Sequence, residues 1–325
     1  MPIKNLSSLQ FEEIFDQIFD EKINKTSIKD FLLDLNKYDL PLNSMIGAVN
    51  SLRKRMKKIQ APDNTIDVCG TGGDKLNTLN ISTAVSFILA GAGITVAKHG
   101  NKAVSSKSGS ADIFQQLNIE ISSDKEVIEK QLNENKLCFL YAPLFHSSLQ
   151  HISEIRKSIN QPTIFNFLGP LLNPANTKTQ LIGTSKKNTM TKIIDVIATL
   201  NNDTKCYVVS GFDGMDEITL TDNSYLLRFE YGKSMPQEII NPQDYSFRKI
   251  DIKEIQGGNI QENAQKLILL LNKEKSAYRD IVVLNSAFAI KLANKANDIN
   301  TAIEIAKESI DSGKAMQVLT KMQKK

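Results

Sequence analysis

The chain has 325 residues, of which 41% are hydrophobic and 23% are charged, and its formal net charge is +4. This composition fits an ordinary globular protein with one large or two moderate domains, and the mild charge argues against a nucleic-acid-binding function. The three cysteines are far apart and include no C-x-x-C pair, so neither a zinc ribbon nor a disulfide framework is indicated. Without a secretory pattern or an apolar run of membrane-spanning length, a cytoplasmic protein is the default expectation.

Residues 1 to about 60 are expected to be wholly helical, because apolar side chains recur there at helical spacing. The stripes start near Phe11, Ile28 and Met45, and Pro41 separates the second from the third. The third helix ends in a basic run, residues 53–58. We interpret this run as the solvated face and cationic end of the helix rather than a nucleic-acid patch.

Beyond Pro62 the pattern changes to alternating strands and helices. Helical segments are expected at 81–91 and 127–132, with another ending at 114–117, and buried strands are expected at 66–69, 94–97, 137–141, 207–210 and 281–284. This alternation predicts an α/β fold with a central, mostly parallel sheet. We expect a small helical domain over 1–65, completed by about 147–180, and a large α/β domain over 66–325. The lysine-rich end, 321–325, is expected to be frayed.

Four polar clusters lie close together in the sequence, at 70–74, 80–83, 98–101 and 105–112. The first, Gly70-Thr71-Gly72-Gly73-Asp74, follows a strand but lacks the spacing of a P-loop or a dinucleotide fingerprint. Each cluster alone is explained by a turn or a helix cap. Together, at the strand ends of a parallel sheet, they predict one site for a heavily phosphorylated ligand.

Other polar residues have ordinary explanations when taken singly. Asp216-Glu217 is an acidic turn by its local sequence, but beside a diphosphate it would suit Mg²⁺, which takes a few carboxylates together with substrate oxygens and water. His99, His146 and His151 do not have the spacing of metal ligands, and Arg156 is by default a surface arginine.

These residues, with three further segments, resemble the anthranilate phosphoribosyltransferase family over nearly the whole chain. The further segments are 163–174, 257–264 and the pair 279–282 with 309–315. The glycine loop is shared with pyrimidine nucleoside phosphorylases, whereas Lys98-His99-Gly100-Asn101 and Asp216-Glu217 single out the transferase. The resemblance implies the nucleoside phosphorylase/phosphoribosyltransferase type of fold. It also implies transfer of the phosphoribosyl group from 5-phosphoribosyl 1-diphosphate (PRPP) to the amine of anthranilate, releasing diphosphate, in tryptophan biosynthesis.

The same resemblance implies the site residues. PRPP would contact Gly70, Gly73, Asp74, Thr78, Asn80, Ile81, Ser82, Thr83, Lys98, His99, Gly100, Asn101, Lys102, Ala103, Val104, Ser105, Ser106 and Ser110. Anthranilate would contact Gly70, Asn101 and Arg156, and Mg²⁺ would bind Ser82, Asp216 and Glu217. Lys98 and Asp74 are the expected catalytic residues; the leaving diphosphate needs charge stabilisation more than the reaction needs a strong base. A homodimer formed through the small helical domain is implied, and an anthranilate synthase subunit is a candidate partner; no nucleic acid or membrane is expected.

The chain departs from the family pattern in three places: Lys102 replaces an arginine, the segment 146–149 replaces His-Pro-Ala-Met, and Asn118 replaces a glycine. Two alternative functions remain open. A pyrimidine nucleoside phosphorylase is disfavoured because the chain lacks that family's later glycine-rich basic motifs. A transferase-like nucleic-acid-binding protein is opposed by the near-neutral charge and by the presence of Asn101 and Asp216-Glu217.

Overall fold

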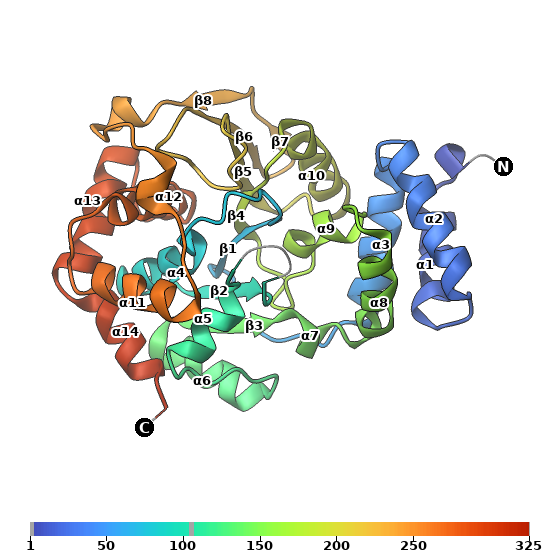
Figure 1. Ribbon diagram of the computed structural model, residues 1–325, viewed down its shortest axis with the longest axis horizontal. Coiled ribbons are helices and arrows are strands. Elements are labelled where there is room, and N and C mark those ends of the chain that lie inside the picture. Colours follow the sequence, from blue (N-terminus) through green and yellow to red (C-terminus); the bar gives the residue numbers. More distant parts are fainter. Residues whose placement is uncertain (1–2, 104–106, 325) are drawn as a thin grey trace.

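The computed structural model describes residues 3–103 and 107–324, and these residues form a single sheet between two groups of helices (Figure 1). The strands of the sheet are β1 (Ile66–Gly70), β2 (Val96–Gly100), β3 (Leu137–Tyr141), β4 (Thr179–Gly183), β5 (Lys205–Gly211), β6 (Ser224–Glu230), β7 (Lys233–Ser234) and β8 (Glu238–Ile240). Their order is β3-β2-β1-β4-β5-β6-β7, and β8 pairs with β6. The first five strands run parallel and β6 is antiparallel to its neighbours, which confirms the mostly parallel sheet.

One group of helices lies at the N-terminal end of the molecule and the other at the opposite end (Figure 1). The helices of the first group and the adjoining segments are α1 (Ser8–Phe19), α2 (Lys25–Lys37), α3 (Leu42–Arg55), α7 (Ala142–Phe145), η2 (Ser147–Leu149), α8 (Gln150–Ile159), α9 (Phe165–Leu168), η3 (Gly169–Leu171) and α10 (Lys187–Leu200). The remaining helices are α4 (Ile81–Gly91), α5 (Ser110–Gln116), α6 (Lys125–Asn135), α11 (Ile260–Leu271), α12 (Ala277–Leu292), α13 (Ile299–Asp311) and α14 (Lys314–Met322). The three N-terminal helices and the segment from α8 to η3 follow the predicted pattern.

The alternation of side chains along each strand divides the core between the two faces of the sheet. On β4, Leu181 packs with α4 and α11 to α14, whereas Ile182 packs with α1 to α3, α8 and α10. The N-terminal helices therefore share a hydrophobic core with one face of the sheet. The division into a domain of 1–65 and a domain of 66–325 remains a proposal.

Two predicted elements are wrong. Residues 281–284 are not a strand but the middle of α12, which is buried nearly all round. A fully buried helix has no polar face, so a short apolar run within it cannot be distinguished from a buried strand. The C-terminal end is not frayed as far as residue 324, because Gln323 bridges to Ile119 and the Lys324 N–H donates to the Asn118 carbonyl at 2.9 Å.

The sequence analysis also missed β4, the strand between β1 and β5, because only Leu181 and Ile182 are strongly apolar within it. The basic run at 53–58 is only partly solvated. The Arg53 guanidinium donates to the Leu171 carbonyl at 3.1 and 3.0 Å and to the Asn201 Oδ1 at 2.8 Å, while Lys54 is exposed. Asn118 has φ +58°, a left-handed conformation that asparagine tolerates and that explains why it can replace a glycine.

The three cysteines are buried and free, as expected of small hydrophobic residues. Within 3–103 and 107–324, no helix combines the length and the apolar character needed to cross a membrane.

Candidate active site

The predicted glycine loop lies at the carboxyl end of β1, beside the acidic pair. Gly72 and Gly73 have φ values of +68° and +78°, which glycine adopts without strain. A methyl group at Gly70 would overlap the Asp216 carboxylate, and one at Gly183, at the end of β4, would overlap the Asp216 carbonyl. The Gly72 N–H donates to Asp216 Oδ2 at 2.7 Å. Two glycines on neighbouring strands therefore make the space in which Asp216 sits against the loop.

The predicted cluster at 80–83 forms the start of α4. Asn80 precedes the helix, but its side chain makes no capping hydrogen bond to it. The positive end of the helix dipole and the first-turn N–H groups of Ile81, Ser82 and Thr83 therefore favour an anion at this point. Thr78, two residues earlier, bridges to Gln256.

The Asn80 side chain instead belongs to a polar network that the sequence analysis did not predict. Ser108 Oγ donates to Asn80 Oδ1 at 2.9 Å, and Asn263 Nδ2 donates to Ser108 Oγ at 2.7 Å. The Tyr278 hydroxyl donates to the Asn80 carbonyl at 3.1 Å. Asn263 on α11 was noted only as part of a resembling segment, and its role in fixing two of the four clusters depends on tertiary contacts.

The third and fourth clusters are joined by the Asn101 carbonyl, and the Asp112 carboxylate closes the loop between them. Asp112, in the first turn of α5, accepts from the Ala103 N–H at 3.0 Å and from the Gly109 N–H at 2.9 Å, so it closes the loop between β2 and α5. At the start of that loop, the Asn101 carbonyl accepts from the Ala111 N–H at 3.2 Å and the Ser110 hydroxyl at 3.3 Å. Val104, Ser105 and Ser106 lie outside the described residues, and Lys102 is exposed.

The carboxyl groups of Asp74, Asp216 and Glu217 form an acidic cluster. Burial raises the pKa of Asp216 to about 7, and the charge of Asp74 adds to this effect. Burial likewise raises the pKa of Glu217 to about 8; Asp216 adds to the rise, and the Lys98 charge and the Ser82 backbone N–H oppose it. The pKa of Asp74 is also raised, again chiefly by burial. Raised pKa values of this kind mark a site that would be stabilised by a cation.

These residues fit a Mg²⁺ ion that is shared with a ligand. The available donors are hard oxygens, namely two carboxylates and the Ser82 hydroxyl, which is the ligand class that Mg²⁺ prefers. Within the described parts of the chain, no group of three or more His, Cys, Asp or Glu side chains is arranged to hold a metal ion. Mg²⁺ commonly completes its octahedron with substrate phosphates and water, so a two-carboxylate set is adequate.

Lys98 and His99 lie at the end of β2 and are both buried. Lys98 Nζ donates to the Val68 carbonyl at 2.8 Å and to Ser82 Oγ at 3.1 Å. Burial lowers the pKa of Lys98, and the Asp67 carboxylate opposes this. The catalytic role predicted for Lys98 would therefore be exerted from inside the fold, through a contact with a residue of the predicted metal set.

His99 packs against His146, with ring centroids 5.3 Å apart. His99 Nδ1 lies 3.1 Å from the Gly169 carbonyl, and His146 Nε2 lies 3.0 Å from the Leu172 carbonyl. A carbonyl can only accept, so these nitrogens carry the protons. Burial lowers the pKa of His99 to about 3 and that of His146 to about 4, so both rings are neutral near pH 7.

Arg156 lies on α8, in the part of the molecule that includes the N-terminal helices. Its guanidinium carbon lies 5.6 Å from the centroid of the Phe165 ring. It makes no hydrogen bond or ion pair with any residue of the described chain, and burial lowers its pKa. Arg156 is thus a partly buried cation without an acidic partner, rather than an ordinary surface arginine.

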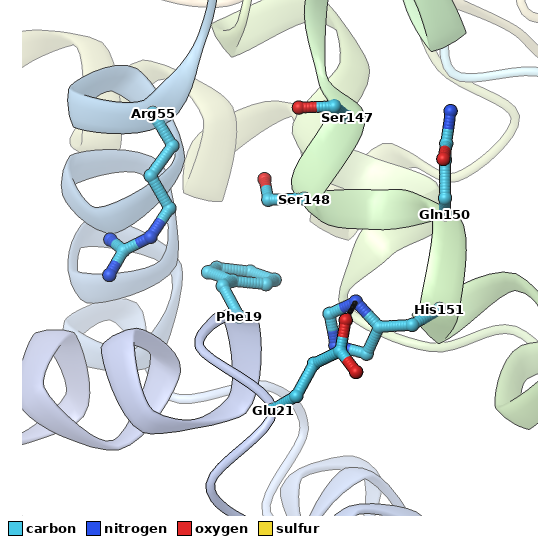
Figure 2. Close-up of a pocket in the computed structure, with 7 residues that line it drawn as sticks. All are labelled: Phe19, Glu21, Arg55, Ser147, Ser148, Gln150 and His151. Atoms are coloured by element: carbon cyan, nitrogen blue, oxygen red, sulfur yellow. Dashed lines mark ion pairs between the residues drawn. The ribbon is translucent and has the colours of Figure 1, made fainter.

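A separate pocket of about 570 Å³ lies between the ends of α1 and α3 and the start of α8 (Figure 2). It is lined by Phe19, Glu21, Arg55, Ser147, Ser148, Gln150 and His151. None of the predicted site residues lines it. Arg55 is already paired with Asp16 and Asp20, so its charge is not available to a ligand.

Comparisons with known proteins show which class of protein has this fold and site. Residues 62–316 match the model of the glycosyl transferase family, a/b domain, so the class is that of the glycosyl transferases. The chain is 39% identical to the anthranilate phosphoribosyltransferase of Petrotoga mobilis over 98% of its own length and 92% of the relative's. It is 40% identical to that of Brucella suis biovar 1, over 95% of this chain and 90% of the relative.

Solved structures agree with these relatives. The chain superposes on anthranilate phosphoribosyltransferase from Thermus thermophilus with a TM-score of 0.90 and 25% identity, covering 98% of this chain and 94% of that one. The enzyme from Saccharomyces cerevisiae in complex with PRPP and Mg gives a TM-score of 0.89 and 26% identity, with 97% and 92% covered. The chain belongs to the anthranilate phosphoribosyltransferase family. The expected fold, family and transferase activity are thereby confirmed, and neither alternative function is supported.

Proposed function

We propose that the carboxyl ends of β1 and β2, with the start of α4, bind PRPP, and that this site transfers its phosphoribosyl group to anthranilate. The single observation that carries this assignment is the juxtaposition of the glycine loop, the start of α4 and the half-buried Asp216-Glu217 pair. Together they offer donors for phosphate oxygens and acidic ligands for a cation.

The chain's own groups would act mainly on the leaving diphosphate. Backbone N–H groups of the loop and of the first turn of α4 would donate to its oxygens, and the helix dipole would stabilise the developing negative charge. Lys98 would add a positive charge beside Ser82. A sugar centre with cationic character asks little of the attacking amine, so the reaction needs no strong base beside it. His99 and His146, which are neutral, are in keeping with that requirement.

Ser82, Asp216 and Glu217 are the residues that would hold Mg²⁺. When bound, Mg²⁺ supplies positive charge to the diphosphate oxygens. Asp74, whose charge raises the pKa of Asp216, would complete the negative surroundings of the ion. The Saccharomyces cerevisiae relative has been solved with PRPP and Mg, which supports the proposal for this chain.

Arg156 and Asn101 would receive the second substrate. A guanidinium that has no acidic partner is suited to a carboxylate, which it binds through two parallel hydrogen bonds. Phe165, against which Arg156 packs, would keep the guanidinium in a low-dielectric environment where this pairing is stronger. Anthranilate offers both the carboxylate and the nucleophilic amine.

We further propose a homodimer formed through the N-terminal helices. Leu9 and Leu42 in this region are 69% and 36% exposed and would be covered by a second copy of the chain. Association with an anthranilate synthase subunit is a proposal that rests on the family resemblance. Sedimentation of the chain alone, and with that subunit, would test both.

The activity is tested by mixing the chain with anthranilate and PRPP, with and without Mg²⁺, and following the loss of anthranilate fluorescence. Loss that requires all three components supports the proposal. Anthranilate-independent cleavage of a pyrimidine nucleoside by phosphate would contradict it and would favour the phosphorylase alternative.

A further inference from the structure

The two strands that carry the PRPP loops are paired along only a small part of their length. Among the described residues of β1 and β2, backbone pairing is confined to Ile66 with Val96. On their other sides the same strands are fully paired, with β1 matching β4 and β2 matching β3 at five positions each. The regular ladder between β1 and β2 therefore stops before their carboxyl ends, where the site lies.

A regular parallel ladder would continue two residues further on, with Val68 opposite Lys98. That rung would join the Val68 N–H to the Ala97 carbonyl and the His99 N–H to the Val68 carbonyl. Instead, three side chains bond to three of these four groups. Lys98 Nζ donates to the Val68 carbonyl at 2.8 Å, Asn173 Nδ2 donates to the Ala97 carbonyl at 2.8 Å, and Asp67 Oδ1 accepts from the His99 N–H at 3.2 Å.

We infer that Asp67 and Asn173 are positioning residues for the transferase reaction: with Lys98 they form a side-chain rung that takes the place of backbone pairing between β1 and β2 at the PRPP site. Buried backbone groups must be paired, so without these side chains the two strands would close into an ordinary ladder or leave three polar groups unsatisfied. Either change would move the glycine loop relative to the Lys98-His99 turn.

The burial of Asp67 indicates that this residue is present for its hydrogen bond and charge rather than for packing. The Asp67 side chain is completely buried, and burial raises its pKa, although the Lys98 charge and hydrogen bonds with Asn173, His99 and Cys69 oppose the rise. A buried carboxylate is costly, so a hydrophobic residue would serve packing better. What Asp67 supplies is an acceptor for His99 and a negative charge that opposes the desolvation of Lys98.

Asn173 is held rigidly by the segment that precedes it. The four carbonyls of 169–172 each accept from a side chain of a different element: His99 on β2, Gln180 on β4, Arg53 on α3, and His146 after α7. The same segment is bonded to β2 through the Gly169 carbonyl and the Asn173 side chain. The rung is therefore fixed at one end by the sheet and at the other by the N-terminal helices.

The inference rests on the proposed function, because it assigns these residues a role in PRPP binding. The test variants are Asp67→Asn, which keeps an acceptor for His99 but removes the charge, and Asn173→Ala, which removes the donor to Ala97. We expect kcat/KM for PRPP to fall about 10-fold in each, while KM for anthranilate stays within about two-fold. Thr65→Val is the matched control, since Thr65 is buried next to β1 with an unpartnered hydroxyl and takes no part in the rung.

A double-mutant cycle separates positioning from a general loss of structure. In a Lys98→Met background, Asp67→Asn should lower kcat/KM for PRPP by less than about two-fold, because the Lys98 charge that Asp67 stabilises is already gone. Unchanged kcat/KM for PRPP in folded Asp67→Asn and Asn173→Ala would overturn the inference, and so would additive losses in the cycle. If Asp67→Asn does not fold, Asn173→Ala alone tests the inference: its kcat/KM for PRPP should fall while its KM for anthranilate stays within about two-fold. Failure of the wild-type chain to consume anthranilate would overturn the proposed function instead.

Discussion

The two halves of the proposed site are built in different ways. The PRPP half is assembled from strand ends, with the glycine loop, the start of α4 and three carboxyl groups tied together by backbone and side-chain hydrogen bonds. The anthranilate half depends on one guanidinium on α8, which contacts an aromatic ring and has no polar partner among the described residues. A multiply charged leaving group needs many preorganised donors, whereas one carboxylate needs a single fork.

The largest expected effect comes from removing the charges of the PRPP half. Asp216→Asn combined with Glu217→Gln should lower kcat/KM for PRPP about 1,000-fold at limiting Mg²⁺, since metal and electrostatic stabilisation act on the leaving group. KM for anthranilate should change little. Full turnover of this variant at limiting Mg²⁺ would show that the metal role is wrong.

A smaller effect is expected from Gly183→Ala, which acts on the seat of Asp216. The new methyl group would overlap the Asp216 carbonyl and should lower the free energy of unfolding by about 3 kcal/mol, with partial loss of activity. Gly169→Ala is the control, because a methyl group there meets no atom within 4 Å. Chemical denaturation gives the free energy of unfolding of both variants. Equal values would disprove the close contact between Gly183 and the Asp216 carbonyl.

For the anthranilate half, Arg156→Ala should raise KM for anthranilate roughly 30-fold, the cost of a charge-assisted pairing, with little change in PRPP binding. Arg156→Lys should recover only part of the loss, because lysine keeps the charge but not the fork. Steady-state kinetics with each substrate varied in turn provides the measurement. The reverse pattern, a raised KM for PRPP alone, would refute the assignment.

The smallest effect concerns His146, which packs against His99 at the boundary between the halves. Its pKa in the folded chain, about 4, lies below the value of 6.5 for an unperturbed histidine. The unfolded chain therefore binds more protons between these values, and stability is lost as the pH falls through this window. Between pH 7 and 5.5, the wild type should lose about 1 kcal/mol more than His146→Gln. An unchanged dependence in His146→Gln would contradict the buried neutral ring.

Sequence reasoning was most successful where the signal is local. The glycine loop and α4 were predicted because strand, turn and helix signals follow one another there within a short segment. The strand expected at 94–97 was placed too early, since β2 covers Val96–Gly100 and includes Lys98 and His99. Prediction failed for 281–284, where burial on every side removes the periodicity. It also missed β4, which is recognisable only from its two paired neighbours.

The sequence by itself determined that four polar clusters lie close together in the chain, two of them at strand ends, and that the chain resembles a phosphoribosyltransferase, because loop composition and local periodicity are properties of neighbouring residues. Only the tertiary structure decided that Asn263 and Tyr278 fix Asn80, and that Asp67, Lys98 and Asn173 replace a rung between β1 and β2. Asp67 and Asn173 are 106 positions apart in sequence numbering. Hydrogen bonds between such distant residues follow from how the strands pack, and no local pattern encodes where the ladder between two strands stops.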